Sequence, residues 1–163
     1  MTLIKPSVYI ETTIPSYLVG RPSRDVIVFA HQELTWTWWT KYRKYFSLYT
    51  SEFVLDEIAN GDQVISSKRL ETLEKVELLD LDDEIRKLAA IYLQKLSIPN
   101  SAATDTLHIA CAVFHKIDYM LTWNCKHLAN ASIRRHLQAI NHGLGLSTPD
   151  LCTPEELLIK EVK

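Results

Sequence analysis

Four side chains that can bind a cation lie where the sequence changes from apolar to polar. Glu11 ends one short apolar run and Asn124 follows another, while Glu57 and Asp105 lie near the starts of two predicted helices. Carboxylate and carbonyl oxygens suit Mg²⁺ or Mn²⁺, which keep several waters and leave positions open for a substrate phosphate. A metal held in this way can activate water and stabilise the leaving oxygen of a phosphodiester. The four residues therefore suggest metal-dependent phosphodiester hydrolysis.

Strand and helix patterns alternate along the chain, which predicts an α/β fold with a parallel sheet of four to five strands. Strands are predicted at about 7–11, 46–50, 76–81 and 119–122, with a further edge strand at 144–146. Helices are predicted at about 24–43, 51–60, 62–75, 82–98, 102–116 and 130–141, with a helical turn at 15–18. The helix at 24–43 carries an apolar stripe at helical spacing, which is predicted to face the core. The members of this stripe are Ile27, Ala30, Leu34 and Trp38.

The direction of the chain places all four candidate ligands at one edge of this sheet. Helices of an open parallel sheet run antiparallel to its strands, so a helix N-terminus lies at the carboxyl edge. Glu11 and Asn124 lie at the carboxyl ends of the first and fourth strands. Glu57 falls in the second turn of the helix after the second strand, and Asp105 falls in the first turn of the helix before the fourth strand. We therefore expect the four side chains to converge where such folds bind their ligands.

Two of the acids also have ordinary explanations. Glu57 lies about 60° around its helix from the inward Val54, whereas Asp56 lies nearly opposite, on the solvent side. Glu57 is therefore the expected inward carboxylate, with a surface position as the alternative. Asp105 would suit a helix N-terminus without any ligand, because the helix dipole favours a negative charge there. The helix that it opens is almost entirely apolar over 107–114, which argues against a fully solvated charge.

Composition bounds the class of protein. The 163 residues carry a net charge of −2, with 47% apolar and 23% charged residues, which predicts a single soluble domain over 1–163. This charge disfavours broad adhesion to nucleic acid but allows a local basic path. No apolar run approaches the ~20 residues of a membrane span, and residues 1–6 lack the apolar core of a secretion signal. The three cysteines form no Cys-x-x-Cys pair, which is typical of free thiols in the cytoplasm.

Four sequence blocks carry a resemblance to a known family. The blocks are 8–17, 54–58, 103–110 and 121–128, and each contains one of the candidate ligands. In this order they resemble PIN-domain proteins of the VapC toxin type, and the match extends over nearly the whole chain. The resemblance implies a three-layer α/β/α PIN-like fold and a Mg²⁺- or Mn²⁺-dependent ribonuclease, with the four ligands in its catalytic positions. It also implies an RNA substrate and, commonly, a partner antitoxin encoded beside a type II toxin.

The chain departs from the family pattern at two of these four positions. The first acid of the family is usually aspartate, and the extra methylene of Glu11 moves its carboxylate by about 1.5 Å. The last acid of the family is here Asn124, whose carbonyl can bind a metal but brings no charge. The longer Glu11 requires the metal to shift or the strand to adjust. The loss of one charge at Asn124 should weaken metal binding and disfavours a second metal. Both changes also leave an alternative function, a catalytically weak or inactive PIN-like module that acts by binding a protein partner.

Further polar residues near these positions are expected to support the site. Thr12 or Thr13 could orient the metal or its water, and Thr122 could brace Asn124. His127 could contact a metal ligand or the substrate phosphate, although a loop histidine without a role fits the sequence as well.

His108 has a weaker case. It lies three residues after Asp105, a spacing that would suit a transition metal on a helix. No second histidine has a matching position, so His108 is not included among the candidate ligands.

Two groups of surface residues suggest partners. Trp36, Trp39 and Tyr42 follow i, i+3 spacing on a second helical face, which suggests a homodimer or a partner helix; packing under a neighbouring helix is the alternative. The best basic clusters could contact RNA phosphates, although solvated helix ends would also explain them. The members of these clusters are Lys41, Arg43, Lys44, Arg134 and Arg135.

Overall fold

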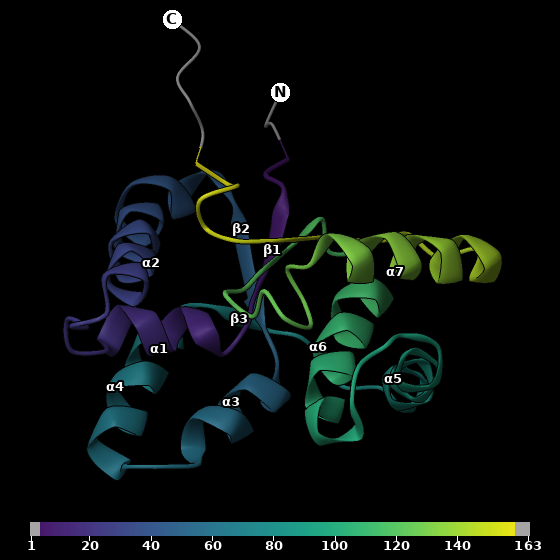
Figure 1. The fold of residues 1–163 in the computed structure, drawn as a ribbon, viewed down its shortest axis with the longest axis horizontal. Coiled ribbons are helices and arrows are strands. Elements are labelled where there is room, and N and C mark those ends of the chain that lie inside the picture. Colours follow the sequence, from purple (N-terminus) through teal and green to yellow (C-terminus); the bar gives the residue numbers. More distant parts are fainter. Residues whose placement is uncertain (1–3, 159–163) are drawn as a thin grey trace, which may run out of the picture.

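Residues 4–158, which the computed structural model describes, form a central sheet with helices on both faces (Figure 1). The strands of this sheet are β1 (Ser7–Ile10), β2 (Ser47–Thr50), β3 (Glu77–Leu78), β4 (Tyr119–Leu121) and β5 (Asp150–Cys152). They lie in the order β3-β2-β1-β4-β5, and each neighbouring pair is parallel. The α/β fold with a parallel sheet, predicted from the alternating pattern, is confirmed.

The helices form two layers around this sheet. They are α1 (Thr13–Val19), α2 (Val26–Thr37), α3 (Glu52–Ala59), α4 (Gln63–Leu73), α5 (Asp83–Lys95), α6 (Ala103–Phe114) and α7 (Ala131–Leu144). In Figure 1, α1, α2 and α4 lie to one side of the strands, and α5, α6 and α7 lie to the other. Among the described residues, no helix is long and apolar enough to cross a membrane.

The strand order places a topological switch point beside β1. The chain runs from β1 to β2 and β3 on one side, and then returns to add β4 and β5 on the other. Ile10 pairs with Leu121, and the backbone N–H of Glu11 donates to the carbonyl of Leu121 at 3.2 Å. The segments that follow β1 and β4 are therefore neighbours at the carboxyl edge. In open α/β sheets, ligands bind in the crevice at such a point.

Helix α6 fixes one side of this edge. Its residues 109–113 are all buried, because the helix packs against both α5 and β4 and has almost no polar face. Asp105 lies in the first turn, as predicted. The burial of α6 thus holds Asp105 at the carboxyl edge of the sheet.

The predicted buried face of the helix at 24–43 is confirmed at Leu34 and Trp38 and is wrong at Ile27 and Ala30. Ile27 is 67% exposed and Ala30 is also exposed, whereas Thr35 and Trp38 are fully buried. The inward face of α2 includes the polar residue Thr35. The indole N–H of Trp123 donates a hydrogen bond to Thr35 Oγ1 at 2.6 Å. This hydrogen bond satisfies a buried threonine that an apolar pattern cannot anticipate.

The predicted aromatic face is also altered. Regular α-helix ends at Thr37, and Trp38–Tyr42 form a π-helical turn followed by a 3₁₀ turn at Arg43–Tyr45. The turn changes the spacing, so that Trp36 is exposed while Trp39 and Tyr42 pack against the core. The three aromatic residues therefore do not form one exposed row, and a homodimer through them stays a prediction.

The edge strand predicted at 144–146 is wrong. Leu144 is the last residue of α7, and Gly145 adopts a left-handed conformation with φ of 69° that ends the helix. The N–H of Leu146 donates back to the carbonyl of Asn141 at 2.9 Å, which is a common helix termination at glycine. The edge strand is instead β5, which pairs with β4 a few residues later.

Candidate active site

Glu11 is a buried carboxylate directly after β1, with only 4% of its surface exposed. Its Oε2 accepts hydrogen bonds from the hydroxyls of Thr13 at 2.6 Å and Thr122 at 2.7 Å, and from the N–H of Thr13 at 3.1 Å. Burial raises the pKa of Glu11 above its usual value, against the opposing effects of the His108 charge and of these hydrogen bonds. All hydrogen bonds that its carboxylate accepts from the described residues end on Oε2, so Oε1 is available to another partner.

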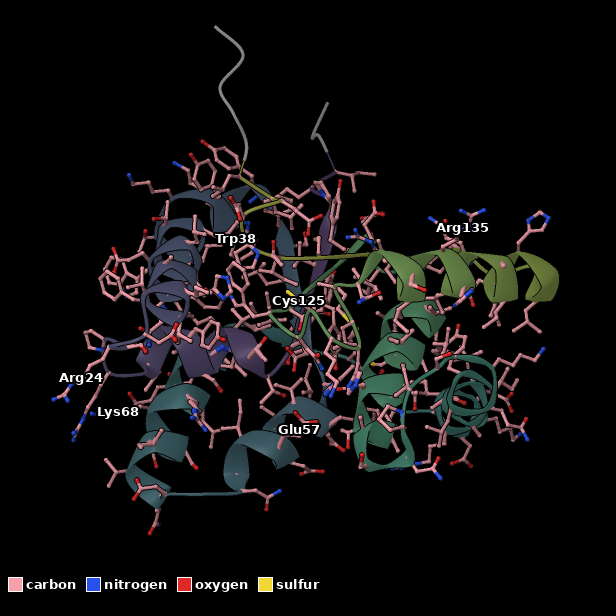
Figure 2. All side chains as sticks on the ribbon, in the orientation of Figure 1. Arg24, Trp38, Glu57, Lys68, Cys125 and Arg135 are labelled. Atoms are coloured by element: carbon pink, nitrogen blue, oxygen red, sulfur yellow. The ribbon has the colours of Figure 1, made fainter. Side chains whose placement is uncertain are left out.

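Glu57 lies opposite Glu11 on α3, whose sequence turns this residue inward while Asp56 is exposed, as predicted. Figure 2 labels Glu57 on this helix, where it faces the space between α1 and α6. Its Oε2 accepts from the hydroxyl of Thr12 at 2.5 Å, and its Oε1 lies 3.0 Å from Nε2 of His108. Partial burial alone would raise the pKa of Glu57, but the His108 hydrogen bond and charge and the Thr12 hydrogen bond hold it below its usual value.

His108 is the functional candidate that the sequence did not select. It is fully buried on α6, with Nε2 beside Glu57 and Nδ1 2.7 Å from the hydroxyl of Tyr9. Burial alone would lower the pKa of His108, but the hydrogen bond to Glu57 and the charges of Glu11, Glu57 and Asp105 raise it. A polar residue within an apolar helix, one turn after Asp105, was the signal available in the sequence.

Ligand atoms of three residues cluster at this edge. One atom each from Glu11, Glu57 and His108 lies within 4.8 Å of the other two, and the group could hold a metal ion. Two carboxylates that face each other repel, and a cation between them removes that repulsion. The available oxygen of Glu11 and the burial of the cluster fit a divalent metal.

Asp105 and Asn124 form a second group with His127. Oδ2 of Asp105 accepts from Asn124 Nδ2 at 3.2 Å and lies 3.0 Å from His127 Nδ1. The N–H of His127 donates to Asn124 Oδ1 at 3.1 Å. The amide nitrogen of Asn124, and not its carbonyl oxygen, therefore faces Asp105. For Asn124 to bind a metal through its carbonyl, as predicted, its side chain must turn.

The hydroxyls expected near the site join the two strand ends across the switch point. Thr13 Oγ1 donates to Glu11 and accepts from the N–H of Trp123 at 2.8 Å. Thr122 Oγ1 donates to Glu11 and accepts from the N–H of Asn124 at 2.9 Å. These bonds lock the carboxylate of Glu11 in one orientation and fix the start of the loop that carries Asn124.

The basic residues expected to contact RNA lie in two different places. Arg43 and Lys44 precede β2, so they lie at the amino edge of the sheet, where they line a cavity of about 450 Å³. Arg134 donates to the carbonyl of Leu151 at 2.8 Å and pairs with Glu156, while Arg135 points outward from α7 (Figure 2). Lys41 lies in the π-helical turn, two residues before Arg43. Their contact with RNA stays a prediction.

Comparison with known proteins adds a likeness of fold. No family model and no curated protein matches this chain. The chain is similar to a chain in the crystal structure of VapBC2 from Rickettsia felis bound to a DNA fragment from their promoter. The likeness covers 90% of this chain and 96% of that chain, with a TM-score of 0.55 and 18% sequence identity. The fold is PIN-like. The three-layer arrangement implied by the resemblance is thereby confirmed.

Proposed function

We propose that the protein is a Mg²⁺- or Mn²⁺-dependent endoribonuclease, and that it acts as the toxin of a type II toxin–antitoxin pair. The observation that carries this proposal is the buried Glu11 beside Glu57 and His108 at the switch point of the sheet. Placing a carboxylate there is costly unless a cation or hydrogen bonds compensate it. The likeness to a chain of the VapBC2 structure agrees with this function.

Each residue of the site has a role in this proposal. Glu11 and Glu57 hold the cation, which when bound lowers the pKa of water and stabilises charge on the phosphate. Thr13 fixes the orientation of Glu11, and Thr12 does the same for Glu57. The hydrogen bonds of Asp105 end on Oδ2, so its Oδ1 can bind the cation or take a proton from an attacking water.

The proposal is tested by RNA cleavage. Purified protein is incubated with mixed RNAs and either Mn²⁺ or Mg²⁺, with and without EDTA. We expect internal cleavage that EDTA stops and that Asp105→Asn abolishes. Asp56→Asn is the matched control, because Asp56 is an exposed neighbour of Glu57 and should leave cleavage unchanged. The proposal would be overturned if the protein shows no EDTA-sensitive cleavage, or if Asp105→Asn retains that cleavage.

An antitoxin partner is supported by exposed apolar side chains on α2 and α4. Val26, Ile27 and Val64 are each at least 65% exposed, which is unusual for large apolar residues that meet only water. Basic residues lie beside Val64, since Arg21, Lys68 and Arg69 line the same cavity of about 580 Å³ as Val64 and Ile65. A partner with apolar and acidic residues fits this surface. Co-purification with the neighbouring gene product, lost in Val64→Glu, would test it.

The alternative is an inactive PIN-like module. It is favoured by one observation, the turn of the Asn124 carbonyl toward the N–H of His127. Calorimetry distinguishes the two functions, since the inactive module predicts no binding of Mn²⁺ or Mg²⁺ together with tight binding of a protein partner.

A further inference from the structure

The position of His108 extends the metal site beyond its carboxylates. A histidine that only filled the core would face apolar neighbours or a backbone carbonyl. His108 is fully buried, yet each ring nitrogen lies within hydrogen-bond distance of a polar side chain, Glu57 on one side and Tyr9 on the other. One ring nitrogen of His108 also belongs to the cluster of ligand atoms that contains Glu11.

The distances within this cluster suit coordination. Two ligands at right angles around a cation, with bonds of about 2.0–2.2 Å, lie about 2.8–3.1 Å apart. Nε2 of His108 and Oε1 of Glu57 are 3.0 Å apart, so a cation can bind both atoms without changing their separation. The whole set spans at most 4.8 Å, against about 4.2 Å for two ligands on opposite sides of a cation. The partly exposed Glu57 side chain can supply that small movement.

The other nitrogen of His108 has the partner that a metal-bound imidazole needs. Metal-binding histidines donate their second ring N–H to a fixed acceptor, which orients the ring. Here Nδ1 lies 2.7 Å from the Tyr9 hydroxyl, which in turn lies 2.6 Å from Ser51 Oγ, and all three side chains are buried. With Nε2 on a metal, Nδ1–H donates to Tyr9 and the Tyr9 hydroxyl donates to Ser51.

Ser51 shows that this chain of hydrogen bonds is maintained at a cost. It is the N-cap residue of α3, where serine usually accepts a hydrogen bond from the helix backbone. Its side chain makes no such capping bond, and its hydroxyl contacts Tyr9 instead. The sequence thus gives up a local helix contact to hold Tyr9 against His108.

His127 provides an internal contrast. Its Nδ1 is also 3.0 Å from a carboxylate oxygen, that of Asp105. Within the described residues, however, its Nε2 has no hydrogen-bond partner and it does not share a cluster with two carboxylates. His127 lacks the features that suit His108 to a metal.

We propose that His108 binds the metal through Nε2, beside Glu11 and Glu57, and that the site therefore selects Mn²⁺ over Mg²⁺. Mg²⁺ prefers oxygen ligands and near-ideal geometry, whereas imidazole nitrogen is accepted by transition metals. This inference rests on the proposed metal-dependent function, and it adds a ligand and a metal preference to it.

The test measures the metal–nitrogen bond directly. Protein loaded with Mn²⁺ is studied by pulsed EPR, and Mn²⁺ and Mg²⁺ affinities are measured by calorimetry. We expect a ¹⁴N coupling in the unaltered protein, replaced by a ¹⁵N coupling when histidine is ¹⁵N-labelled. We expect Mn²⁺ to bind at least about tenfold more tightly than Mg²⁺. His127→Asn should keep the coupling, because His127 contacts Asp105 and not the cluster of Glu11, Glu57 and His108.

Two variants locate the bond at His108. His108→Asn should remove the coupling and lower Mn²⁺ affinity by more than about tenfold, while Tyr9→Phe should keep the coupling and lower the affinity by about 10–100-fold. If His108→Asn does not fold, the labelled unaltered protein and His127→Asn still decide the question. Mn²⁺ binding without nitrogen coupling, or coupling lost in His127→Asn, overturns the inference and leaves metal-dependent cleavage intact. Absence of all divalent metal binding overturns both proposals.

Discussion

Two histidine–carboxylate pairs lie at the same edge of the sheet, and they differ in their surroundings. In each pair the nitrogen and oxygen are 3.0 Å apart. The side chain of His108 is completely buried and that of Glu57 is 31% exposed, whereas His127 and Asp105 are 16% and 15% exposed. Only His108 has a second buried partner, Tyr9. Equal distances therefore do not imply equal roles, because burial and the remaining hydrogen bonds set the cost of separating each pair.

The largest expected effect comes from removing the charge of each carboxylate in turn. Glu57→Gln and Asp105→Asn should each lower RNA cleavage by about 10²–10³-fold, because both are proposed to act at the reacting phosphate. Cleavage is measured under single-turnover conditions with saturating Mn²⁺, beside Asp56→Asn. Full activity in Asp105→Asn would contradict the role of Asp105 at the reacting phosphate and would overturn the proposed nuclease function.

Replacing each histidine with alanine should lower the unfolding free energy of the protein by different amounts for the two pairs. His108→Ala should destabilise the metal-free protein by about 3 kcal/mol, because it leaves the buried Tyr9 hydroxyl without one of its two partners and opens a cavity. His127→Ala should cost less, about 1 kcal/mol, because the His127 side chain keeps some contact with solvent and its Nε2 makes no hydrogen bond to the described residues. Urea unfolding in EDTA measures both values. Similar losses in the two variants would remove the distinction between the pairs.

The pH dependence of stability shows whether the buried pair carries charge. The pKa of His108 is raised above its ordinary 6.5 in the folded protein, so protonation stabilises the fold below that pH. This contribution is lost as pH rises above 6.5 through the folded pKa, while Glu57, whose pKa is lowered, is already ionised there. We expect the melting temperature in EDTA to fall between pH 6 and pH 9. A profile equally steep in His108→Asn would assign the effect elsewhere.

The smallest expected effect concerns the hydrogen bond behind His108. Ser51→Ala should cost about 1 kcal/mol of unfolding free energy, because it leaves the Tyr9 hydroxyl without one of its two partners. Tyr9→Phe should cost a similar amount, and the double variant should cost less than the sum, because both changes remove the same bond. Strict additivity would show that Ser51 and Tyr9 do not act as one support.

Part of the site could be predicted because it follows from chain direction and helical period. Glu11 and Asn124 follow the strands β1 and β4. Asp105 opens α6, and Glu57 lies in the second turn of α3. The edge of the sheet at which such positions lie is fixed by the parallel topology. The inward position of Glu57 and the exposure of Asp56 follow from 100° per residue. The same rule, applied to Arg43 and Lys44, places them at the opposite edge, because they precede a strand.

The remaining features of the fold and the site depended on contacts between segments that are far apart in the sequence. The pattern of α2 could not reveal that Thr35 faces inward, since its partner Trp123 lies in a distant loop. Asn124 looked like a metal ligand, but its amide orientation is set by His127 and Asp105. The left-handed conformation of Gly145 ends α7, so the predicted edge strand at 144–146 does not form and β5 is the edge strand.

The sequence by itself therefore determined the strand and helix alternation and the edge at which the acids gather. These features depend on the spacing of apolar and polar residues along the chain, which can be read from consecutive residues. Only the tertiary structure decided that His108 joins Glu11 and Glu57 while His127 pairs with Asp105. That choice depends on how α6 packs against α3 and β1, and a rotation of one residue would turn His108 away from the site.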